Sequence, residues 1–477
     1  MRSWLFSLLF CCLLGTLVWA QDAVPPAPTA NSVNAVTVPP PPVIPAPATA
    51  PTVTTPSIPI PPPAPVTASP APVTSAPAAT APTPAAAATP VPAAANPTVS
   101  APPAAATPEL ATFTIGYVQL TNDARYDDKR MTAQFLGQPL GRPFAATESA
   151  LKEVKFHGQA AGVKFAIQPV EGANSAELIK QVQALQAQGV QFVLADLPAA
   201  SLLEVATAFK GQKLAFFNLS APEDNLRQAQ CQANVFHTLP NHAMQADALV
   251  QYLVAHKWRE ALQLEGPAPD DKLLSAAFER AAKRYGVKIV EKRSFVLGND
   301  PRERDKNNIA LLTGGDYDVV YIADSSGEFA RGANYQTLSP RPVVGSEGMN
   351  ALAWNWAWER HGAPQVEKRF EKQAGRHMSD VDWASWMAIK AIATAVQQTK
   401  TTDFAQLQTY LLADNTTLDG AKGNASSFRP WDHQLRQPLL LSTHNWVVDR
   451  APLQGFLHQI NNLDTLGFDQ RDSQCKF

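Results

Sequence analysis

Short apolar runs rich in β-branched residues alternate along this chain with segments of helical periodicity. Two such runs, 189–198 and 213–222, are followed later by two more, 317–326 and 342–348, and each ends in a short polar loop. Apolar runs of this length between helical segments are typical of parallel strands that are buried on both faces. The pattern therefore predicts an α/β protein with two successive parallel sheets.

The same patterns predict the other elements of both sheets. Strands are expected at 113–120, 163–170, 260–265 and 287–295, with a β-rich stretch at 428–448. Helices are expected at 143–156, 175–188, 199–209, 242–256, 270–286, 354–362, 380–399 and 403–411. Because ligands bind beyond the carboxyl ends of the strands in open parallel sheets, two such sheets predict a binding cleft between two lobes.

The first 20 residues have the pattern of a secretion signal. Arg2 supplies a positive charge, residues 4–18 are almost wholly apolar, and Ala20 ends a sequence suited to signal peptidase. The alternative is an uncleaved membrane anchor, although the apolar run is shorter than the roughly 20 residues that span a bilayer. We therefore expect cleavage after Ala20 and export to the periplasm.

Residues 21–111 are expected to form a disordered arm rich in Pro and Ala. Between positions 23 and 108 the chain has no charged residue, no glycine and no aromatic residue. Such a segment cannot bury enough apolar surface to offset the entropy of ordering, and its prolines favour an extended polyproline II conformation. The sequence does not distinguish a functional tether from a passive linker.

Removal of the signal would leave Cys231 and Cys475 as the remaining cysteines. In an oxidising compartment, two cysteines are expected to form one disulfide, here between a loop and the extreme C-terminus. Two free thiols are the alternative.

Charge and motifs exclude several classes of protein. The 477-residue chain has a formal net charge of −2, so it lacks the excess of positive charge that is typical of nucleic-acid-binding proteins. Its sequence contains no nucleophile elbow, phosphate-binding loop, zinc-protease motif or dinucleotide fingerprint. The histidines also lack metal-ligand spacing, with His237 and His242 the nearest approach. We therefore expect no enzyme, no catalytic residue, no cofactor and no metal.

Candidate ligand contacts lie in loops that follow predicted strands. Asp196 and Leu197 follow one strand, and Ser220 and Ala221 follow the next. Each pair precedes a predicted helix, whose free N–H groups favour an anionic or hydrogen-bond-accepting ligand. Alternatively, Ser220 caps its helix and Asp196 satisfies backbone donors in its own loop.

Other candidates come from the second half of the chain. Glu347 follows an apolar strand, where its carboxylate would meet a cationic or hydroxylated ligand group or stay solvated. Trp354 and Trp356 lie near the predicted cleft mouth, where one of them would stack on a ligand. The spacing of Trp383 and Trp386 on a helix instead indicates core packing.

A family resemblance is carried by several short stretches. They are Leu140–Phe144, Phe192–Pro198, Tyr317–Val320, Ser427–Trp431, Gln434–Pro438 and Gln454–Gln459. On these stretches the folded part, about residues 112–477, resembles the type I periplasmic binding proteins, and the branched-chain amino-acid group in particular. More narrowly, it is similar to the substrate-binding proteins associated with pyrroloquinoline-quinone-dependent alcohol dehydrogenase systems.

The resemblance implies two Rossmann-like lobes, joined by three crossings of the chain, that close on a ligand about a hinge. Lobe one is expected at 112–236 plus 346–415, and lobe two at 237–345 plus 416–477.

The resemblance also implies ligand contacts in the first lobe. Family members hold the ligand carboxylate with a Ser- and Thr-rich turn after the third strand, where this chain has Asp196 and Leu197. Ser220 and Ala221 match the second contact on the carboxylate side. Arg142 lies within one of the matching stretches and is a further candidate.

On the opposite side of the expected ligand, Glu347 matches the acid that binds the ligand ammonium in relatives. Ser325 and Ser326 stand where relatives often place a tyrosine. The ammonium side is thus kept and the carboxylate side is altered, so an ordinary amino acid is not the expected ligand.

The resulting expectation is a monomeric periplasmic receptor that passes a small polar solute, linked to alcohol oxidation, to an ABC permease. A ligand sensor or partner-binding module not coupled to transport is the main alternative. An enzyme is disfavoured by the missing motifs, and an empty scaffold is left open by the altered Asp196 turn.

Overall fold

The computed structural model describes residues 110–127, 140–298 and 300–477. The predicted export signal and almost all of the predicted arm lie outside these residues. Within the described part of the chain, no helix is long and apolar enough to cross a membrane.

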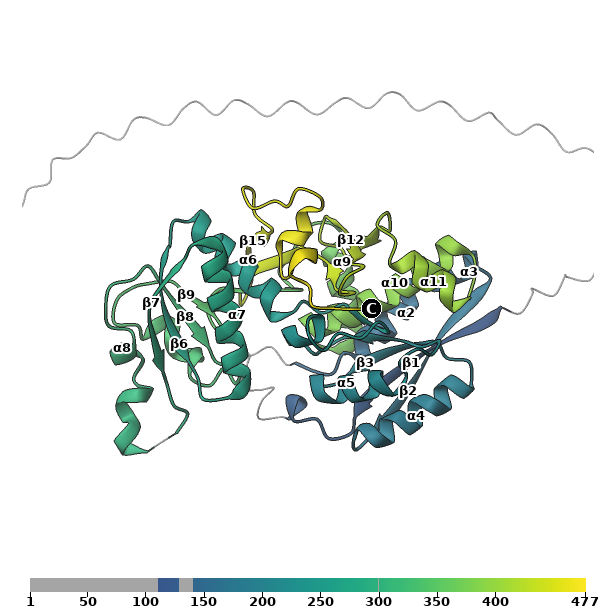
Figure 1. Cartoon of the computed structure of the whole chain (residues 1–477), viewed down its shortest axis with the longest axis horizontal. Coiled ribbons are helices and arrows are strands. Elements are labelled where there is room, and N and C mark those ends of the chain that lie inside the picture. The colour runs from purple at the N-terminus through teal and green to yellow at the C-terminus, as the bar shows by residue number, and fades with distance from the viewer. Residues whose placement is uncertain (1–109, 128–139, 299) are drawn as a thin grey trace, which may run out of the picture. The chain divides into compact units, whose positions relative to one another are not determined.

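The first lobe is built on a five-stranded parallel sheet with the order β2-β1-β3-β4-β5 (Figure 1). Its strands are β1 (Ala111–Leu120), β2 (Val163–Gly172), β3 (Phe192–Asp196), β4 (Ala215–Asn218) and β5 (Val235–His237). The helices of this part are α2 (Phe144–Glu153), α3 (Lys155–Ala160), α4 (Ser175–Ala187) and α5 (Ala199–Ala208). Alternate strand residues face opposite sides, so Val193 packs with α4 and α5 while Phe192 and Leu194 pack in the core shared with α2.

The second lobe has a four-stranded parallel sheet with the order β7-β6-β8-β9. Its strands are β6 (Glu260–Glu265), β7 (Lys288–Ser294), β8 (Val319–Ala323) and β9 (Val343–Gly345). One face packs against α6 (His242–Ala255) and α7 (Pro269–Tyr285), and the other packs against α8 (Ile309–Leu312) and the 3₁₀ turn at Ala330–Tyr335. The predicted α/β architecture with two parallel sheets is confirmed.

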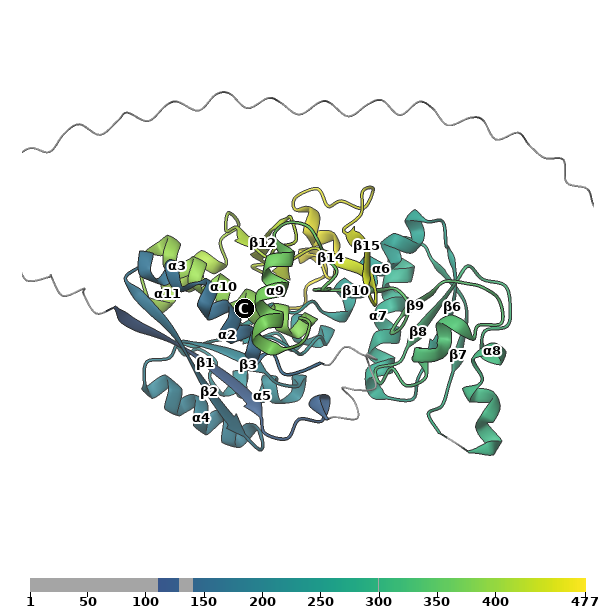
Figure 2. The same cartoon turned by 180° about the vertical axis from the view of Figure 1, so that it is seen from behind.

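The rest of the chain completes both lobes (Figures 1 and 2). Helices α9 (Ala363–Ala374), α10 (Asp380–Thr399) and α11 (Phe404–Leu411) cover the first sheet on the side of α2. The remaining strands are β10 (Asn350–Leu352), β11 (Leu418–Asp419), β12 (Ala425–Phe428), β13 (Leu435–Arg436), β14 (Leu439–Thr443) and β15 (Trp446–Ala451). They form two small antiparallel sheets, β10-β14-β15 and β11-β12-β13.

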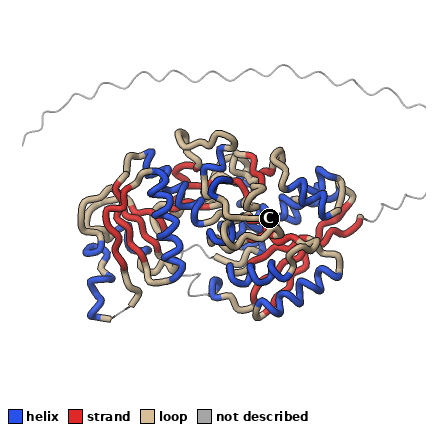
Figure 3. Tube along the Cα trace, viewed as in Figure 1, coloured by secondary structure: helices blue, strands red, loops and turns tan. Residues whose placement is uncertain are grey.

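Two local predictions differ from the structure. Residues 354–362 are turns and loop, not the predicted helix, and the next helix begins at Ala363 (Figure 3). The Asn355 side chain accepts a hydrogen bond from the backbone N–H of Ala357 at 2.9 Å, which competes with helix formation. His361 and Gly362 then adopt the left-handed conformation. The short strand β5 was also not predicted.

Core packing also differs from the expected lobe boundary near residue 416. Leu418, Phe428 and Leu435 belong to the core of the first lobe, whereas Leu439 and Leu441 belong to that of the second. The chain therefore changes lobes between β13 and β14. The hydrophobic residues of β11 and β12 face α10 and strands of the first lobe, which is why this segment stays there.

A buried lysine joins the segments that cross between the lobes. Lys422 Nζ donates to the backbone oxygen of Ala353 at 2.9 Å and to Gln437 Oε1 at 2.8 Å. Gln437 Nε2 in turn donates to the backbone oxygen of Thr238 at 2.8 Å. Thr238, Ala353 and Gln437 lie on the three connections between lobes, so these bonds hold the connections side by side.

Two C-terminal stretches of the family resemblance, Ser427–Trp431 and Gln434–Pro438, belong to a buried ionic network. Asp464 accepts from Arg429 Nε at 2.8 Å and from Arg436 Nε at 2.9 Å. Gln434 accepts from Arg227 Nε at 3.0 Å and donates to the backbone of Leu239 at 3.0 Å. These residues pack the end of the chain against the region between β5 and α6, which accounts for their unusual density of polar groups.

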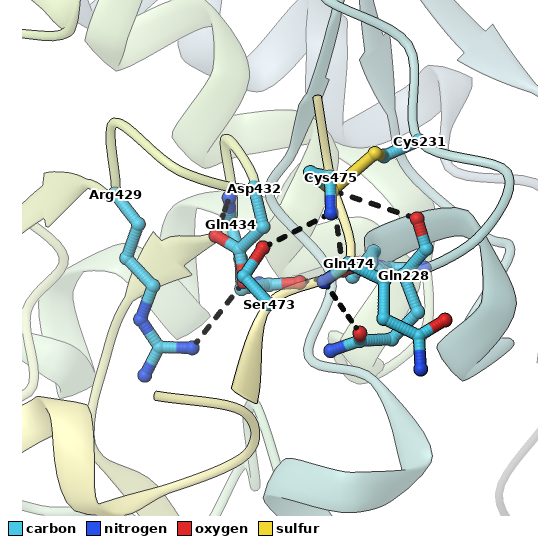
Figure 4. The surroundings of a disulfide bond; sticks show 9 residues. Gln228, Cys231, Arg429, Asp432, Gln434, Ser473, Gln474 and Cys475 are labelled. Atoms are coloured by element: carbon cyan, nitrogen blue, oxygen red, sulfur yellow. Dashed lines mark hydrogen bonds and ion pairs between the residues drawn. A yellow bond between two sulfur atoms is a disulfide. The ribbon is translucent and has the colours of Figure 1, made fainter. Parts of the chain in front are cut away.

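The predicted disulfide between Cys231 and Cys475 is present (Figure 4). The two residues are 244 positions apart in the sequence, and their Cα atoms are 5.6 Å apart. Next to it, the backbone N–H of Gln474 donates to Gln228 Oε1 at 3.0 Å. The extreme C-terminus is thereby fixed to the loop that follows β4.

Candidate functional site

A cavity of about 400 Å³ lies where the two lobes face each other. Its lining comes from loops beyond the strands of both sheets and from the segments that join the lobes. The first lobe and its neighbouring segments contribute Arg125, Tyr126, Leu140, Gly141, Ser220, Pro222, Glu223, Trp354, Asn355, Trp356, His377, Met378, Ser379, Asp380 and Val381. The second lobe contributes His242, Asp270, Leu274, Ser325, Gly348, Asn350, Leu352, Thr443 and His444.

Asp196 lies behind this lining as the centre of a polar cluster. It ends β3, is fully buried, and accepts from Tyr126 Oη and Ser220 Oγ, each at 2.7 Å. Arg125 Nη2 donates to the same Oδ1 atom at 3.2 Å, and Arg142 Nη1 lies 4.0 Å from Oδ2. Asp196 therefore holds the cavity wall together without being part of the lining, and Ser220 does not serve as a helix cap.

Arg125 commits its whole guanidinium group to neighbours within the protein. Its Nε and Nη2 donate to Asp123 at 3.0 and 2.6 Å, and Nη2 also donates to Asp196. Its Nη1 donates to the backbone oxygen of Ser220 at 3.1 Å and to Ser220 Oγ at 2.9 Å. A guanidinium has five N–H donors, and these contacts account for all of them. Arg125 lines the cavity but has no donor left for a ligand carboxylate.

The charges of this cluster reinforce one another. Burial by itself raises the pKa of Asp123, but the hydrogen bond and the charge of Arg125 outweigh it, and the pKa is lowered. Burial likewise opposes the charge on Arg125, yet Asp123 and Asp196 raise its pKa. Burial and the Asp196 carboxylate raise the pKa of Tyr126 well above its usual value, so its hydroxyl stays protonated and donates.

Glu347 is the centre of a second polar cluster, on the side of the second lobe. Its Oε1 accepts from His444 Nε2 at 2.7 Å, Asn334 Nδ2 at 3.1 Å and the backbone N–H of Gly348 at 3.1 Å. Glu347 is buried and does not line the cavity, whereas Gly348 and His444 do. Glu347 is therefore positioned behind the lining, as Asp196 is in the first lobe.

The remaining predicted residues separate into two groups. Ser325 lines the cavity, and its backbone N–H donates to Asp271 Oδ1 at 2.6 Å. Trp354 also lines the cavity, although it is mostly buried in the core of the first lobe. Its Nε1 donates to Glu367 Oε2 at 2.8 Å. Leu197 and Ala221, in contrast, point into the core around α4 and α5, away from the cavity.

Two further predicted residues lie near the cavity without lining it. Ser326 Oγ donates to Asp324 Oδ1 at 2.7 Å and so belongs to the loop after β8. Arg142 donates to the backbone oxygen of Leu120 at 2.9 Å, and its guanidinium lies 4.8 Å from the centre of the Tyr126 ring. The predicted positions therefore surround the cavity, but only Ser220, Ser325 and Trp354 among them are part of its lining.

Several acidic and aromatic lining residues were not predicted. Glu223 is half-buried, and its pKa is raised mainly by burial and further by the charge of Asp270, which Arg227 and Arg125 partly offset. Burial raises the pKa of Asp380 to about 6. Burial and the charge of Arg227 lower the pKa of His242 to about 4, so that its imidazole is neutral at pH 7. No motif marks these residues in the sequence, because the fold brings them together from distant segments.

Metal binding has no support in the described residues, since no group of three or more His, Cys, Asp or Glu side chains there is arranged to hold an ion.

Comparisons with known proteins bear on the fold. A protein family described as periplasmic binding protein matches residues 136–302. A branched-chain amino acid ABC transporter periplasmic ligand-binding protein from Burkholderia xenovorans superposes with a TM-score of 0.59 at 14% identity, covering 76% of this chain and 98% of that one. The fold is that of the type I periplasmic binding proteins.

Two other similar structures illustrate the range of this fold. A leucine-, isoleucine-, valine-, threonine- and alanine-binding protein from Brucella ovis, in a closed conformation, has a TM-score of 0.54 at 17% identity, covering 69% of this chain and 88% of that one. A solute-binding protein of an R. palustris ABC transporter, in complex with benzoate, has a TM-score of 0.54 at 13% identity, covering 77% and 100%. A comparison with curated protein sequences finds no match.

Proposed function

We propose that this protein is an exported receptor of an ABC transporter that captures a small solute between its lobes and closes on it. The observation that carries the proposal is the cavity of about 400 Å³, whose lining comes from both lobes at the ends of their strands. A solute there would contact both lobes at once and so favour the closed arrangement over an open one. Binding and closure require no bond chemistry.

The segments between the lobes support a hinge. Lys422 and Gln437 tie the three connections together through side-chain bonds to backbone oxygens at Ala353 and Thr238. Such bonds keep the connections aligned while the lobes rotate about them. We propose that the first lobe comprises about 112–236 plus 353–437, and that the second comprises the rest of the folded chain.

The solute is proposed to differ from the usual amino acid. Asp196 stands where relatives place a hydroxyl-rich turn, and the donors of Arg125 are already used within the protein. A link to alcohol oxidation, a periplasmic location and a monomeric state are further parts of the proposal, and they rest on the sequence resemblance. ATPase and permease genes beside this gene would favour transport over a sensor that uses the same cleft.

The test is a comparison of native and denaturing mass spectra of the full chain, purified from a host with a periplasm. We expect a discrete extra mass in the native spectrum that is lost on denaturation. Two variants on neighbouring residues of α7 control for the site: Leu274→Trp places a large ring in the cavity, and Leu273→Trp places the same ring on the exposed side of the helix. The extra mass should disappear in the first variant and persist in the second.

An unliganded wild-type spectrum, repeated after incubation with alcohols, acids, amino acids and amines, would contradict the receptor function. An extra mass that survives equally in both tryptophan variants would place the solute outside this cavity.

A further inference from the structure

We propose that the cleft takes a small organic cation, an amine with an apolar body, whose charge lies between Glu223 of the first lobe and Asp270 of the second. The proposal deepens the receptor function and rests on it. It names the chemical class of the solute and the contact that draws the lobes together.

The two carboxylates come from opposite sides of the cavity. Glu223 follows β4 in the first lobe, and Asp270 belongs to the first turn of α7 in the second lobe. Both line the same cavity. They are close enough that the charge of Asp270 contributes to raising the pKa of Glu223, after the larger effect of burial. An approach of the lobes therefore brings like charges together.

Neither carboxylate forms an ion pair within the described residues, although the charges of Arg227 and Arg125 partly offset the raised pKa of Glu223. The buried Oε2 atom of Glu223 has no hydrogen-bond partner among the described residues. Asp270 forms no ion pair within the same residues. A cation between the two would replace their repulsion with two attractions, which would strengthen as closure of the lobes shields the exposed Asp270 from water.

The nearby protein cations do not fill this role. Arg125 uses its donors on Asp123, Asp196 and Ser220. Arg227 is fully buried below the cavity, where Nη1 donates to the backbone oxygen of Ala221 at 2.7 Å. His242 lines the cavity as a neutral ring, because burial lowers its pKa to about 4.

The other walls suit the apolar body of such a ligand. Apolar side chains from both lobes line the cavity: Leu140, Leu274, Leu352, Met378 and Val381. Tyr126, Trp354 and Trp356 add aromatic surface, which attracts organic cations as well as apolar groups. A cavity of about 400 Å³ is within the range of small-molecule sites, and a ligand with one ring is of suitable size.

The cavity is unfavourable for an anionic ligand. A benzoate-type carboxylate would face Glu223 and Asp270, while Arg125 has no free donor to offer it. The chain therefore shares its fold with a protein solved in complex with benzoate but differs from it in the preferred charge of the ligand.

The test is isothermal titration of the full chain, stripped of solute, with ligands that share a ring and differ in the head group. One series is 2-phenylethylamine, 2-phenylethanol and phenylacetate, and a second series carries a cyclohexyl ring. We expect the amine of at least one series to bind tenfold or more tightly than its alcohol and its carboxylate. Its affinity should also fall as salt concentration rises, because the contact is between charges.

Matched variants locate the contact. Glu223→Gln and Asp270→Asn should each lower amine affinity by about tenfold, a loss of roughly 1.4 kcal/mol, and should leave alcohol affinity unchanged. Two control variants, Glu204→Gln on α5 and Glu328→Gln after β8, each remove one exposed acid that lies outside the cavity, one from each lobe. They should change neither the amine affinity nor the alcohol affinity.

Failure of this proposal can be told apart from failure of the receptor function. Equal binding of all head groups, tighter carboxylate binding, or amine binding that ignores both cavity variants would overturn the cation proposal and leave a receptor. Absence of amine binding, with a different solute found by mass spectrometry, would do the same. Absence of any bound solute would overturn both.

Discussion

Asp196 in the first lobe and Asp324 in the second occupy corresponding places in the two sheets, but they form hydrogen bonds with different kinds of partner. Strand β3 lies between β1 and β4, and β8 lies between β6 and β9. Asp196 is the last residue of β3, and Asp324 is the first residue after β8. Both side chains are buried.

Their hydrogen-bond partners come from different parts of the chain. Asp196 accepts from Tyr126 and Ser220, which lie 70 and 24 positions away in the sequence. Asp324 accepts from the backbone N–H groups of Ser326, Phe329 and Ala330 in its own loop. Asp196 thus assembles one wall of the cleft from distant segments, whereas Asp324 closes a local turn.

The difference shows that an acid after a buried strand predicts a polar site but not its partners. In the first lobe the partners include a cation that the acid neutralises, and every donor of that cation, Arg125, is used within the protein. The carboxylates that remain available in the cleft, Glu223 and Asp270, follow no such pattern in the sequence.

Among these substitutions, Asp196→Asn is expected to reduce stability most. Removing this charge leaves the Arg142 guanidinium without its counter-charge and leaves Arg125 with Asp123 alone. Loss of one partner of a buried ion pair typically costs about 3–5 kcal/mol. We expect a reduction of that size in the free energy of unfolding, measured by urea denaturation. Asp316→Asn is the matched control, because its carboxylate is almost fully exposed, and it should have little effect.

A second substitution tests the geometry of the same cluster. Arg125→Lys keeps the positive charge but loses the planar arrangement of donors that reaches Asp123, Asp196 and Ser220 together. We expect a loss of about 2 kcal/mol in urea denaturation, since charged hydrogen bonds are worth about 1.5–3 kcal/mol each and the lysine retains some of them. A lysine variant as stable as the wild type would show that charge alone holds the cluster.

The corresponding change in the second lobe should be milder. In Asp324→Asn, the amide oxygen can still accept from part of the loop, so only some of its bonds are lost. We expect a loss of about 1–2 kcal/mol. Hydrogen exchange of the Phe329 and Ala330 amides would locate the effect in the loop. A loss equal to that of Asp196→Asn would remove the distinction between the two acids.

The smallest expected effect depends on pH. Because Arg125 holds the pKa of Asp123 below its ordinary value, the folded state binds this proton less tightly than the unfolded state does. Asp123 therefore adds stability above the unfolded pKa of about 3.9, and that stability is lost as pH falls through the lower folded pKa.

We expect Asp123→Asn to cost about 1 kcal/mol at pH 7. The difference from the wild type should stay constant above about pH 5 and shrink in acid. Urea denaturation at a series of pH values measures it, and a difference that grows as pH falls would contradict the assigned pairing.

Much of the fold could be predicted because it depends on patterns local in sequence. The apolar runs at 189–198 and 317–326 contain strands β3 and β8, and Ser175 and Gly189 lie close to the two ends of α4. The helix expected at 354–362 is absent because the Asn355 side chain accepts from the backbone N–H of Ala357 and forms a local turn instead.

The candidate site was predicted less completely, for a physical reason. Strand ends can be located from sequence, so Ser220 and Ser325 were placed near the cleft. Whether a residue after a strand points into the cleft or into the core depends on packing, and Leu197 and Ala221 point into the core. Glu223 and Asp270 line one cavity only because the two lobes bring distant segments of the chain together.

The central claim is that the lobes close on a solute, and a distance between the lobes tests it most directly. Spin labels on Gln183→Cys in α4 and Lys283→Cys in α7 lie on exposed positions of opposite lobes. Double electron–electron resonance would measure the label separation with and without the solute found by mass spectrometry. We expect the separation to shorten when solute binds, and we expect Leu274→Trp to abolish the change. An identical distance distribution with saturating solute would contradict it.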